Sequence, residues 1–224
     1  MPNPIKPTLK TELPAILIIV VSIILSIFFY YKLPETVVTH WNFAGEPNGW
    51  MSRFWASIML PLMTIGLYIM FLVMPYADPR KERYANFTNV YHIFKDVILL
   101  FLVLIFLISN LNNLGYNLPI NIYVPILVGI LFVIMGNYFG KIKQNWFVGI
   151  RTPWTLSSNE VWNKTHRMGG KLFMLGGVMI ASTGIAPLSW RVPLFVLAMI
   201  ILVGGTFAYS YWAYYNEKKN NPKQ

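Results

Sequence analysis

Long apolar stretches alternate with short polar segments along the whole chain. Most of these stretches approach the roughly 20 residues that an α-helix needs to cross about 30 Å of hydrocarbon. Six of them are expected to form membrane helices, at residues 13–31, 55–74, 97–111, 120–139, 172–188 and 192–215. The pattern therefore predicts an all-α, polytopic membrane protein with six transmembrane helices.

The third stretch is the shortest of the six. Its strictly apolar part, residues 97–108, has only twelve residues. It crosses the membrane only if Asn110, Asn112 and Asn113 lie near the interface or face other helices, because lipid offers these amides no partner. We include it because the fourth stretch would otherwise have the wrong orientation for the charges around it.

Composition and charge agree with a membrane protein. The chain is 56% hydrophobic and 12% charged, whereas soluble domains carry about 25% charged residues. If both termini are cytoplasmic, the outer segments hold only Lys32, Arg53 and Arg191, and the inner segments hold the other fifteen of the eighteen Lys and Arg. The positive-inside rule therefore predicts cytoplasmic termini. This asymmetry also explains the net charge of +10 without a direct nucleic-acid partner.

The pattern divides the chain into three parts. Residues 1–75 form a two-helix unit with an outer loop, residues 76–118 a third helix with its flanking loops, and residues 119–224 the last three helices with an inner loop. No small-residue cleavage site follows the first helix, so we expect an uncleaved anchor. The absence of cysteine excludes disulfides and thiolate metal sites.

Small residues four positions apart occur in the last two predicted helices. Gly177 and Ala181 form one pair, and Gly204 and Ala208 form the other. Such pairs let helices approach closely, so the fifth and sixth helices are expected to pack together. The alternative is that these pairs simply reflect how common glycine is in membrane helices.

The outer loop, residues 33–54, has the sequence LPETVVTHWNFAGEPNGWMSRF, and its glycines and prolines predict tight turns. One interpretation is an ordered loop whose tryptophans dock at the headgroup level. The other is a surface that binds a hydrophobic peptide from outside, with Trp41 giving contact area and His40 and Asn42 giving hydrogen bonds. One histidine with two glutamates is too small a ligand set for a metal site.

The inner loop, residues 140–170, concentrates basic and aromatic residues over a length that a plain connection does not require. Gly149 permits unusual backbone angles, and Pro153 fixes the chain. Arg151 presents a planar donor fork beside Trp154, on which a guanidinium can stack. Alternatively, the basic residues of this loop rest on anionic lipid headgroups.

The last part of this loop predicts the start of a helix. Ser157 or Ser158 is expected to cap it, and Trp162, His166 and Gly169 then fall on one face. A catalytic role would need His166 as a base, but the chain shows no HExxH, Ser-His-Asp set or glycine-rich phosphate loop. We therefore expect no enzyme activity, no catalytic residues and no cofactor.

Both loops resemble those of a known family. The inner stretch GNYFGKIKQNWFVGIRTPWTLSSNEVWNKTHRMGGKL is similar to the signature of the SdpI family, in which G-[IL]-R-T-P-W-T-L precedes a VW pair and the last membrane spans. The outer loop resembles a short membrane domain of unknown function that carries HWN followed by G-x-P. The resemblance covers most of the chain, with the motifs in the family's order.

The resemblance implies a multi-pass protein of the bacterial cell membrane that gives immunity to a secreted toxic peptide and signals to a cytoplasmic transcriptional repressor. Its implied partners are the lipid bilayer, that peptide and that repressor. The residues implied to function at the outer loop are His40, Trp41, Asn42, Gly45 and Pro47. Those implied at the inner loop are Asn137, Asn145, Gly149, Arg151, Thr152, Pro153, Trp154, Thr155 and Trp162, to which position on the same helix face adds His166.

Two other functions stay open from the sequence. A small transporter or exporter would need ionisable residues buried near the middle of the membrane. The centres of the predicted helices hold none, and Lys95 and Asp96 lie only at an entrance. A membrane-embedded enzyme would rely on His166 and Arg151.

Overall fold

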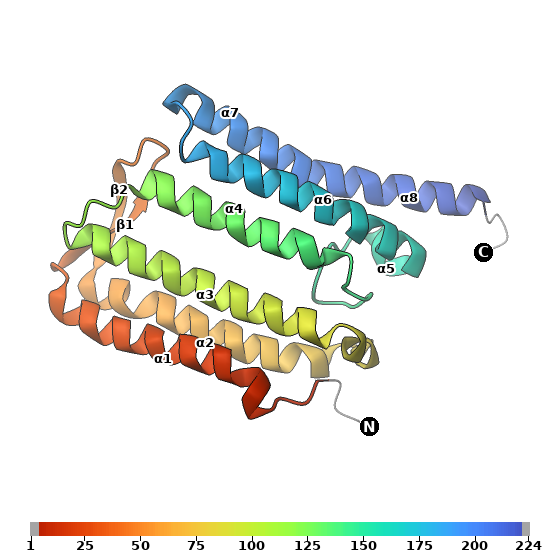
Figure 1. Cartoon of the computed structure of the whole chain (residues 1–224), viewed down its shortest axis with the longest axis horizontal. Helices are drawn as coiled ribbons and strands as arrows, with labels where there is room; N and C mark the ends of the chain where they lie inside the picture. Colours follow the sequence, from red (N-terminus) through yellow and green to blue (C-terminus); the bar gives the residue numbers. More distant parts are fainter. Residues whose placement is uncertain (1–4, 221–224) are drawn as a thin grey trace.

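The computed structural model describes residues 5–220. Six long helical runs follow one another in alternating directions and form an elongated bundle (Figure 1). They are α1 (Leu9–Lys32), α2 (Arg53–Ala77), α3 (Thr88–Asn113), α4 (Ile120–Phe139), α6 (Asn159–Thr183), and a last run made of α7 (Leu188–Met199), the π-helix η2 (Ile200–Gly205) and α8 (Thr206–Asn220). The connections contain the strands β1 (Thr36–Trp41) and β2 (Pro47–Ser52), the 3₁₀-helix η1 (Lys81–Asn86) and the short helix α5 (Pro153–Ser157).

Within residues 5–220, five runs are long and apolar enough to cross a membrane, namely α1, α2, α3, α4 and the run Leu188–Asn220. The all-α, polytopic membrane fold is thereby confirmed. α6 has a comparable length of 25 residues, but the polar residues in its first half lower its hydropathy. The count of six crossings and the cytoplasmic position of both termini therefore stay predictions.

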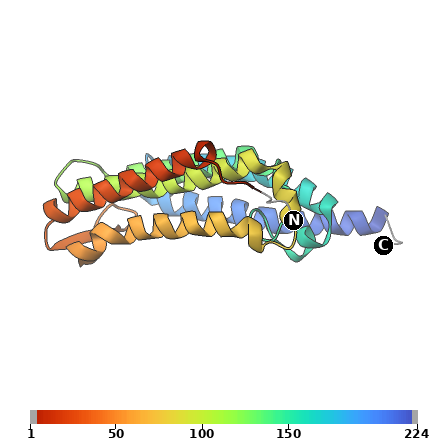
Figure 2. The ribbon, with the colours of Figure 1, turned by 90° about the horizontal axis from the view of Figure 1, so that it is seen from below.

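The helices form two groups. α1, α2 and α3 each pack against the other two as a three-helix bundle. Figure 2 shows α2 out of the plane of α1 and α3. α6 lies between α4 and the last run, and α3 packs against α4 to join the groups (Figure 1). The fold therefore brings the second and third predicted parts of the chain into one continuous bundle.

α4 and α6 touch backbone to backbone along a row of glycines. A Cβ atom on Gly136 would lie 2.6 Å from the carbonyl oxygen of Gly170, and one on Gly177 would lie 2.7 Å from that of Gly129. α6 does pack against the last run, as predicted, but not through the predicted small residues, since Gly177 and Ala181 face α4. Gly204 has only Ile200 of its own run nearby, so the second predicted pair does not form a helix contact.

The third helix is longer than its apolar pattern predicted. α3 begins at Thr88, nine residues before the predicted start, because its first turns mix polar residues with buried ones such as Val90 and Phe94. The sequence required the asparagines at the end of this helix to lie near the interface or face other helices, and their amides do find partners within the protein. Asn110 is buried and donates from Nδ2 to the carbonyl of Phe106, while Asn113 bonds to the backbone of Val38 in β1.

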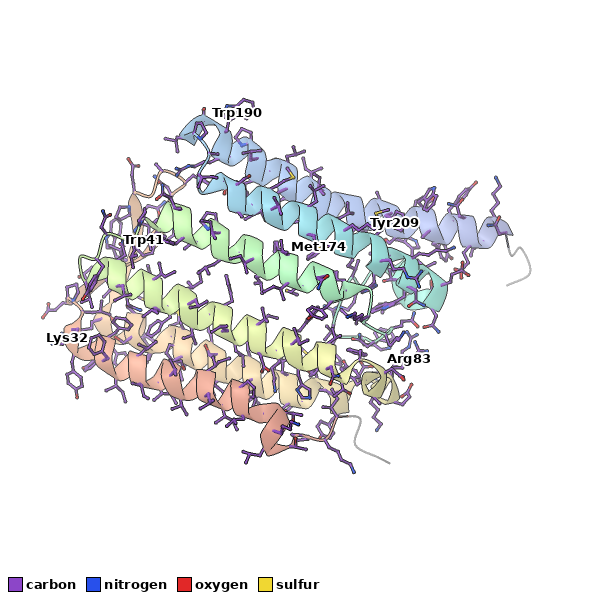
Figure 3. The ribbon with its side chains drawn as sticks, viewed as in Figure 1. Lys32, Trp41, Arg83, Met174, Trp190 and Tyr209 are labelled. Carbon is purple, nitrogen blue, oxygen red and sulfur yellow. The ribbon has the colours of Figure 1, made fainter. Side chains whose placement is uncertain are left out.

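The two loops lie at opposite ends of the bundle. β1 and β2 cap one end, and α5 lies at the other end, where α1 also begins and α8 also ends (Figure 1). Lys32, Trp41 and Trp190 lie at the strand-capped end and Arg83 at the opposite end (Figure 3). We call these the hairpin end and the signature end. The sequence predicted turns at the hairpin end but missed the paired strands.

Candidate functional site

The outer loop is an antiparallel β-hairpin whose turn is built by Asn42. Its Oδ1 accepts hydrogen bonds from the backbone N–H groups of Ala44 at 2.9 Å and Glu46 at 3.0 Å, and its Nδ2 donates to the Glu46 carboxylate. Gly45 has a φ of +88°, a conformation that side chains disfavour. Pro47 begins β2. These three predicted residues therefore shape the hairpin.

The side chain of His40 is held by the facing strand. Its Nδ1 lies 2.5 Å from Oδ1 of Asn48, and Gly49 lies directly opposite it. A Cβ on Gly49 would come within 2.8 Å of the Cβ of His40, so the ring has room only because that position is glycine. The sequence missed the contact between Asn48 and His40.

Three contacts fix the hairpin to the bundle. Asn113 of α3 exchanges two hydrogen bonds with the backbone of Val38, at 2.8 and 2.9 Å, as a neighbouring strand would. Gly45 lies against Asn121 of α4, where a Cβ would come within 2.9 Å of Cγ. Arg191 of α7 donates from Nη1 to the carbonyl of Phe43 at 2.8 Å. The hairpin is therefore seated on α3, α4 and α7.

A cavity of about 460 Å³ lies under the hairpin, and we call it the hairpin cavity. Apolar side chains make most of its wall, and Arg191 is the one Lys, Arg, Asp or Glu among the lining residues. The full lining is His40, Trp41, Asn42, Phe43, Asn48, Ile120, Asn121, Val124, Pro125, Val128, Ile180, Thr183, Arg191 and Phe195. Its size lies within the roughly 300–1,000 Å³ of small-ligand pockets.

A second cavity of about 470 Å³ lies on the other side of the hairpin, between α2, α3 and α4. We call it the flanking cavity. His40 and Trp41 line both cavities, as do Ile120 and Val124 of α4. Trp50, on β2, is exposed and lines neither cavity. His40 and Trp41 thus separate two apolar hollows that open at the same end of the protein.

At the signature end, His166 organises the turn that precedes α5. Its Nε2 accepts the backbone N–H of Ile150 at 3.0 Å, and its Nδ1 donates to the carbonyl of Trp162 at 2.9 Å. Gly149, at φ +114°, lies against the ring, and a Cβ there would collide with Nε2. His166 lies in the first half of α6 and is shielded from solvent. This burial disfavours the charged ring and lowers the pKa of His166 to about 4. The ring is therefore neutral and fully hydrogen-bonded, which suits a structural role rather than a base.

The residues that follow Gly149 form a helix start. Thr152 and Thr155 make a capping box, with the Thr152 hydroxyl accepting the N–H of Thr155 and the reverse bond present as well. Pro153 occupies the first turn, where its missing N–H costs nothing. Trp154 packs on Phe207 and Tyr211 of α8. This short helix therefore ties the segment to the last run.

The predicted stacking of Arg151 on Trp154 is wrong. A different guanidinium lies over a tryptophan here, because Arg80 lies over Trp146 with its guanidinium carbon 5.8 Å from the ring centre. Arg151 is exposed and donates from Nη1 to the carbonyl of Trp146 at 2.7 Å. Trp154 faces α8 instead, so the guanidinium finds a backbone partner rather than a ring.

Two more predicted residues are buried parts of the scaffold. Asn145 accepts the backbone N–H groups of Phe147 and Val148 on its Oδ1 and donates from Nδ2 to the carbonyls of Lys143 and Val148. Trp162 is fully buried and donates from Nε1 to the carbonyl of Ile142 at 2.9 Å. Asn137, by contrast, is exposed near the end of α4. Of the predicted inner residues, Asn137, Arg151 and Pro153 are exposed.

The sequence missed the residues that join the α2–α3 connection to this segment. Oδ2 of buried Asp78 accepts the N–H of Trp146 at 2.8 Å and the hydroxyl of Tyr84 at 3.0 Å. Burial and the nearby Asp78 carboxylate raise the pKa of Tyr84, which keeps the phenol a neutral donor. Arg83 bonds to Gln144 at 2.8 Å. The only local signal was an aspartate directly after a membrane helix, and its partner is 68 residues away.

Ionisable side chains are also buried between α1, α2 and α3, near the helix ends where the sequence placed Lys95 and Asp96. Lys95 is 1% exposed and forms an ion pair with Glu12, which is 6% exposed. His92 lies 3.7 Å from Glu12, and Asp96 lies 3.8 Å from Lys95. Both are on α3, and together with Glu12 and Lys95 they form what we call the buried charge cluster. It lies toward the signature end, because Glu12 is in the first turn of α1.

The helix start predicted near Ser157 or Ser158 is confirmed at Ser158. Its hydroxyl accepts the N–H groups of Glu160 and Val161 at the start of α6. Trp162 and His166 stack with ring centres 4.0 Å apart, as their shared helix face predicted. No group of three or more His, Asp or Glu able to hold a metal occurs in the described part of the chain.

Comparison with known proteins finds two family models that match separate parts of the chain. A sequence model of the SdpI/YfhL protein family matches residues 141–210, and one of a domain of unknown function (DUF1648) matches residues 17–65. The chain is 27% identical over 205 residues to the immunity protein SdpI of Bacillus subtilis (strain 168), covering 90% of this chain and 96% of that protein. The resemblance drawn from the two loop motifs is thereby confirmed. No solved structure matches the chain.

Proposed function

We propose that this chain is a membrane immunity protein that protects a bacterium from a secreted, membrane-active toxic peptide by binding that peptide at the hairpin end. The immunity role is supported by the similarity to the Bacillus subtilis immunity protein along nearly the whole chain. The binding step is supported above all by one observation. A hairpin seated on α3, α4 and α7 lies between two apolar cavities, of about 460 and 470 Å³, at a single end of the bundle.

The hairpin cavity and the flanking cavity suit an apolar peptide. Concave apolar pockets with a few placed polar groups are the usual form of ligand sites. Trp41 offers a rigid aromatic surface to both cavities, and His40 and Asn48 add hydrogen-bonding groups beside it. Two side chains of one peptide would enter the two cavities on either side of Trp41. Such a site removes the peptide from the lipid by binding alone, without any chemical step.

In the same proposal, the signature end signals to the cytoplasm that the peptide is bound. In this proposal both termini are cytoplasmic, so the exposed Trp146 and Arg151 face the cytoplasm, where a transcriptional repressor would dock. Trp146 is 45% exposed and is held by Asp78, Arg80 and Arg151. Asp78 follows α2 directly, and α2 begins beside the hairpin. α2 therefore runs between the proposed binding side and the proposed reporting side.

A transporter or exporter is the second candidate, and the buried charge cluster is the observation that favours it. Ionisable groups inside a helix bundle often mark a pathway for ions or substrates. Glu12, Lys95 and His92 line a cavity of about 420 Å³ near the signature end. A membrane enzyme is less well supported, because both ring nitrogens of His166 are occupied by backbone groups.

Bacterial survival tests the leading proposal. We would express the protein in a bacterium that lacks its own immunity protein and expose it to a secreted toxic peptide of this type. We expect Trp41→Ala to abolish most of the protection, because it empties a wall of both cavities. Trp50→Ala is the matched control, since Trp50 lies on the same hairpin but lines neither cavity. Equal loss of protection in both variants, at equal membrane levels, would contradict a binding site at the cavities.

Transport and sequestration are distinguished with purified protein in liposomes. A fluorescently labelled toxic peptide is added outside, and its appearance inside is followed with time. Sequestration predicts binding that saturates without net transfer. Net transfer that depends on a proton gradient would support the exporter instead.

A further inference from the structure

We infer that the hairpin cavity binds the carboxylate-bearing end of an apolar peptide, with Arg191 as the anion-binding group. This inference rests on the proposed function, because it names which part of the toxic peptide the hairpin end would hold. It adds a ligand chemistry and a residue that neither the sequence motifs nor the family resemblance assigned.

The charge in the cavity is unbalanced. Arg191 lines it, whereas no carboxylate does. The ion pairs formed among residues 5–220 do not include Arg191. A guanidinium carries five N–H donors, and Arg191 directs Nε to the carbonyl of Ala186 at 3.1 Å and Nη1 to that of Phe43 at 2.8 Å. Its Nη2 group forms no hydrogen bond with the described residues and remains available to an anion.

The surroundings favour a carboxylate over an uncharged group. Arg191 is half-buried beside Phe195, which packs edge-on against Phe43 with ring centres 5.6 Å apart. A positive charge beside apolar groups gains most from an anion, to which the Nη2 group can donate a charge-assisted hydrogen bond. The two carbonyl contacts hold the guanidinium in place before the ligand arrives, so less freedom is lost on binding.

The rest of the cavity matches the last residues of a peptide. Apolar side chains of α4 and α6 form its floor, including Val124, Val128 and Ile180. Asn121 and Thr183 provide uncharged polar groups there. Nδ1 of His40 is hydrogen-bonded to the amide oxygen of Asn48. Nε2 of the same ring is therefore left to accept a peptide N–H. A pocket of this size accommodates a short terminal segment rather than a whole peptide.

The test compares free-acid and amidated peptides. The full-length protein is immobilised in nanodiscs of zwitterionic lipid and exposed to a library of N-acetylated apolar hexapeptides made of Leu, Ile, Val, Phe and Gly. The library is synthesised once with free carboxylates and once with carboxamide ends, and retained peptides are quantified by mass spectrometry. We expect the acids to be retained about tenfold to a hundredfold better, as for other hydrogen bonds to charged groups.

Substitutions and competing anions test whether the preference for acids arises at Arg191. Arg191→Gln should remove the preference for the acid, whereas Arg191→Lys should retain part of it. Arg53→Gln is the control, because Arg53 lies at the same end and does not line the hairpin cavity. The acid-to-amide contrast in the unaltered protein needs no variant, so a misfolded variant does not affect it. Phosphatidylglycerol and oleate are added separately as competitors that supply an anion from lipid.

Each outcome has one meaning. Retention of acids and amides to the same extent would overturn the carboxylate inference while leaving the hairpin end as a peptide site. No retention of either library would overturn the inference and count against the proposed function. Displacement of the acids by stoichiometric phosphatidylglycerol or oleate, lost in Arg191→Gln, would show that the cavity holds a lipid anion instead.

Discussion

Gly129 of α4 and Gly177 of α6 meet with no side chain between them, and a Cβ on Gly177 would lie 2.7 Å from the carbonyl oxygen of Gly129. Gly136 and Gly170 repeat this relationship one step along the same pair of helices. The two positions on each helix are seven residues apart, so one face of each helix carries the contact. This close approach holds α6, whose first half is polar, against an apolar neighbour.

Gly177→Ala should destabilise the protein by about 1–3 kcal/mol, because the added methyl overpacks the contact with α4. Gly66→Ala is the control, since no atom lies within 4 Å of the position a Cβ would take there. Thermal unfolding in detergent, followed by circular dichroism, checks both. A midpoint for Gly177→Ala equal to that of Gly66→Ala would contradict the backbone contact.

His166 should make stability depend on pH. Its pKa is about 4 in the folded protein, below the value of about 6.5 expected when unfolded. The unfolded chain therefore takes up a proton first, so the stabilisation is present above pH 6.5 and is lost as pH falls toward 4. The loss should reach about 3 kcal/mol. Unfolding midpoints between pH 8 and pH 4 should fall more steeply in the unaltered protein than in His166→Gln. Parallel curves would disprove this assignment.

Asp78→Asn should loosen the attachment of the inner loop to the connection between α2 and α3. The carboxylate accepts hydrogen bonds from the N–H of Arg80, the N–H of Trp146 and the hydroxyl of Tyr84. The NH2 group of asparagine would point at one of these three donors, which would then lose its hydrogen bond. We expect this loss to lower the free energy of unfolding by about 1–3 kcal/mol. Glu82→Gln is the control, because Glu82 is exposed on η1. Faster hydrogen exchange at Trp146 in Asp78→Asn alone is the expected result, and unchanged exchange would refute it.

Lys95→Leu should be strongly destabilising, because it leaves the buried Glu12 carboxylate without its cation. Removing one partner of a buried ion pair costs about 3–5 kcal/mol. The double variant Glu12→Leu plus Lys95→Leu should recover part of that loss, since the buried Glu12 carboxylate no longer stands without its cation. Lys164→Ala, which breaks an exposed pair with Glu160, should change stability by less than about 0.5 kcal/mol. A double variant no more stable than Lys95→Leu would argue against the pairing.

Arg151→Lys should reduce protection against the toxic peptide more than Lys141→Ala does. Arg151 holds the exposed Trp146 through its carbonyl at 2.7 Å, and a lysine ammonium does not reproduce a planar fork. Lys141 rests on the ring of Tyr138 at the edge of the segment. Survival curves at equal membrane levels measure the difference. Equal effects of the two substitutions would undercut a specific reporting surface at the signature end.

The positions of the helices followed from the sequence because each depends on local properties. An apolar run of sufficient length forms a helix in lipid wherever its neighbours lie, so α1, α2, α4 and the last run match their predicted stretches. Ser158 caps α6 through bonds that reach only two and three residues along the chain. The loop motifs were likewise complete within short segments, and they were sufficient to indicate the family.

The roles of the site residues depended on distant partners. Half of the predicted inner residues, among them Asn145, Thr155 and Trp162, are buried parts of the scaffold rather than contact residues. The sequence could not reveal this, because a motif shows which residues occur together but not which of them face solvent.

Sequence alone thus determined the membrane class, the apolar runs and the two loop motifs, since these are set by composition and short-range spacing. Tertiary structure decided that Gly177 packs on α4, that Glu12 pairs with Lys95 across 83 residues, and that Arg191 reaches the hairpin at Phe43 across 148 residues. The physical reason is that helical spacing fixes which side chains share a face, whereas the neighbour that face meets is chosen by the packing of the whole bundle.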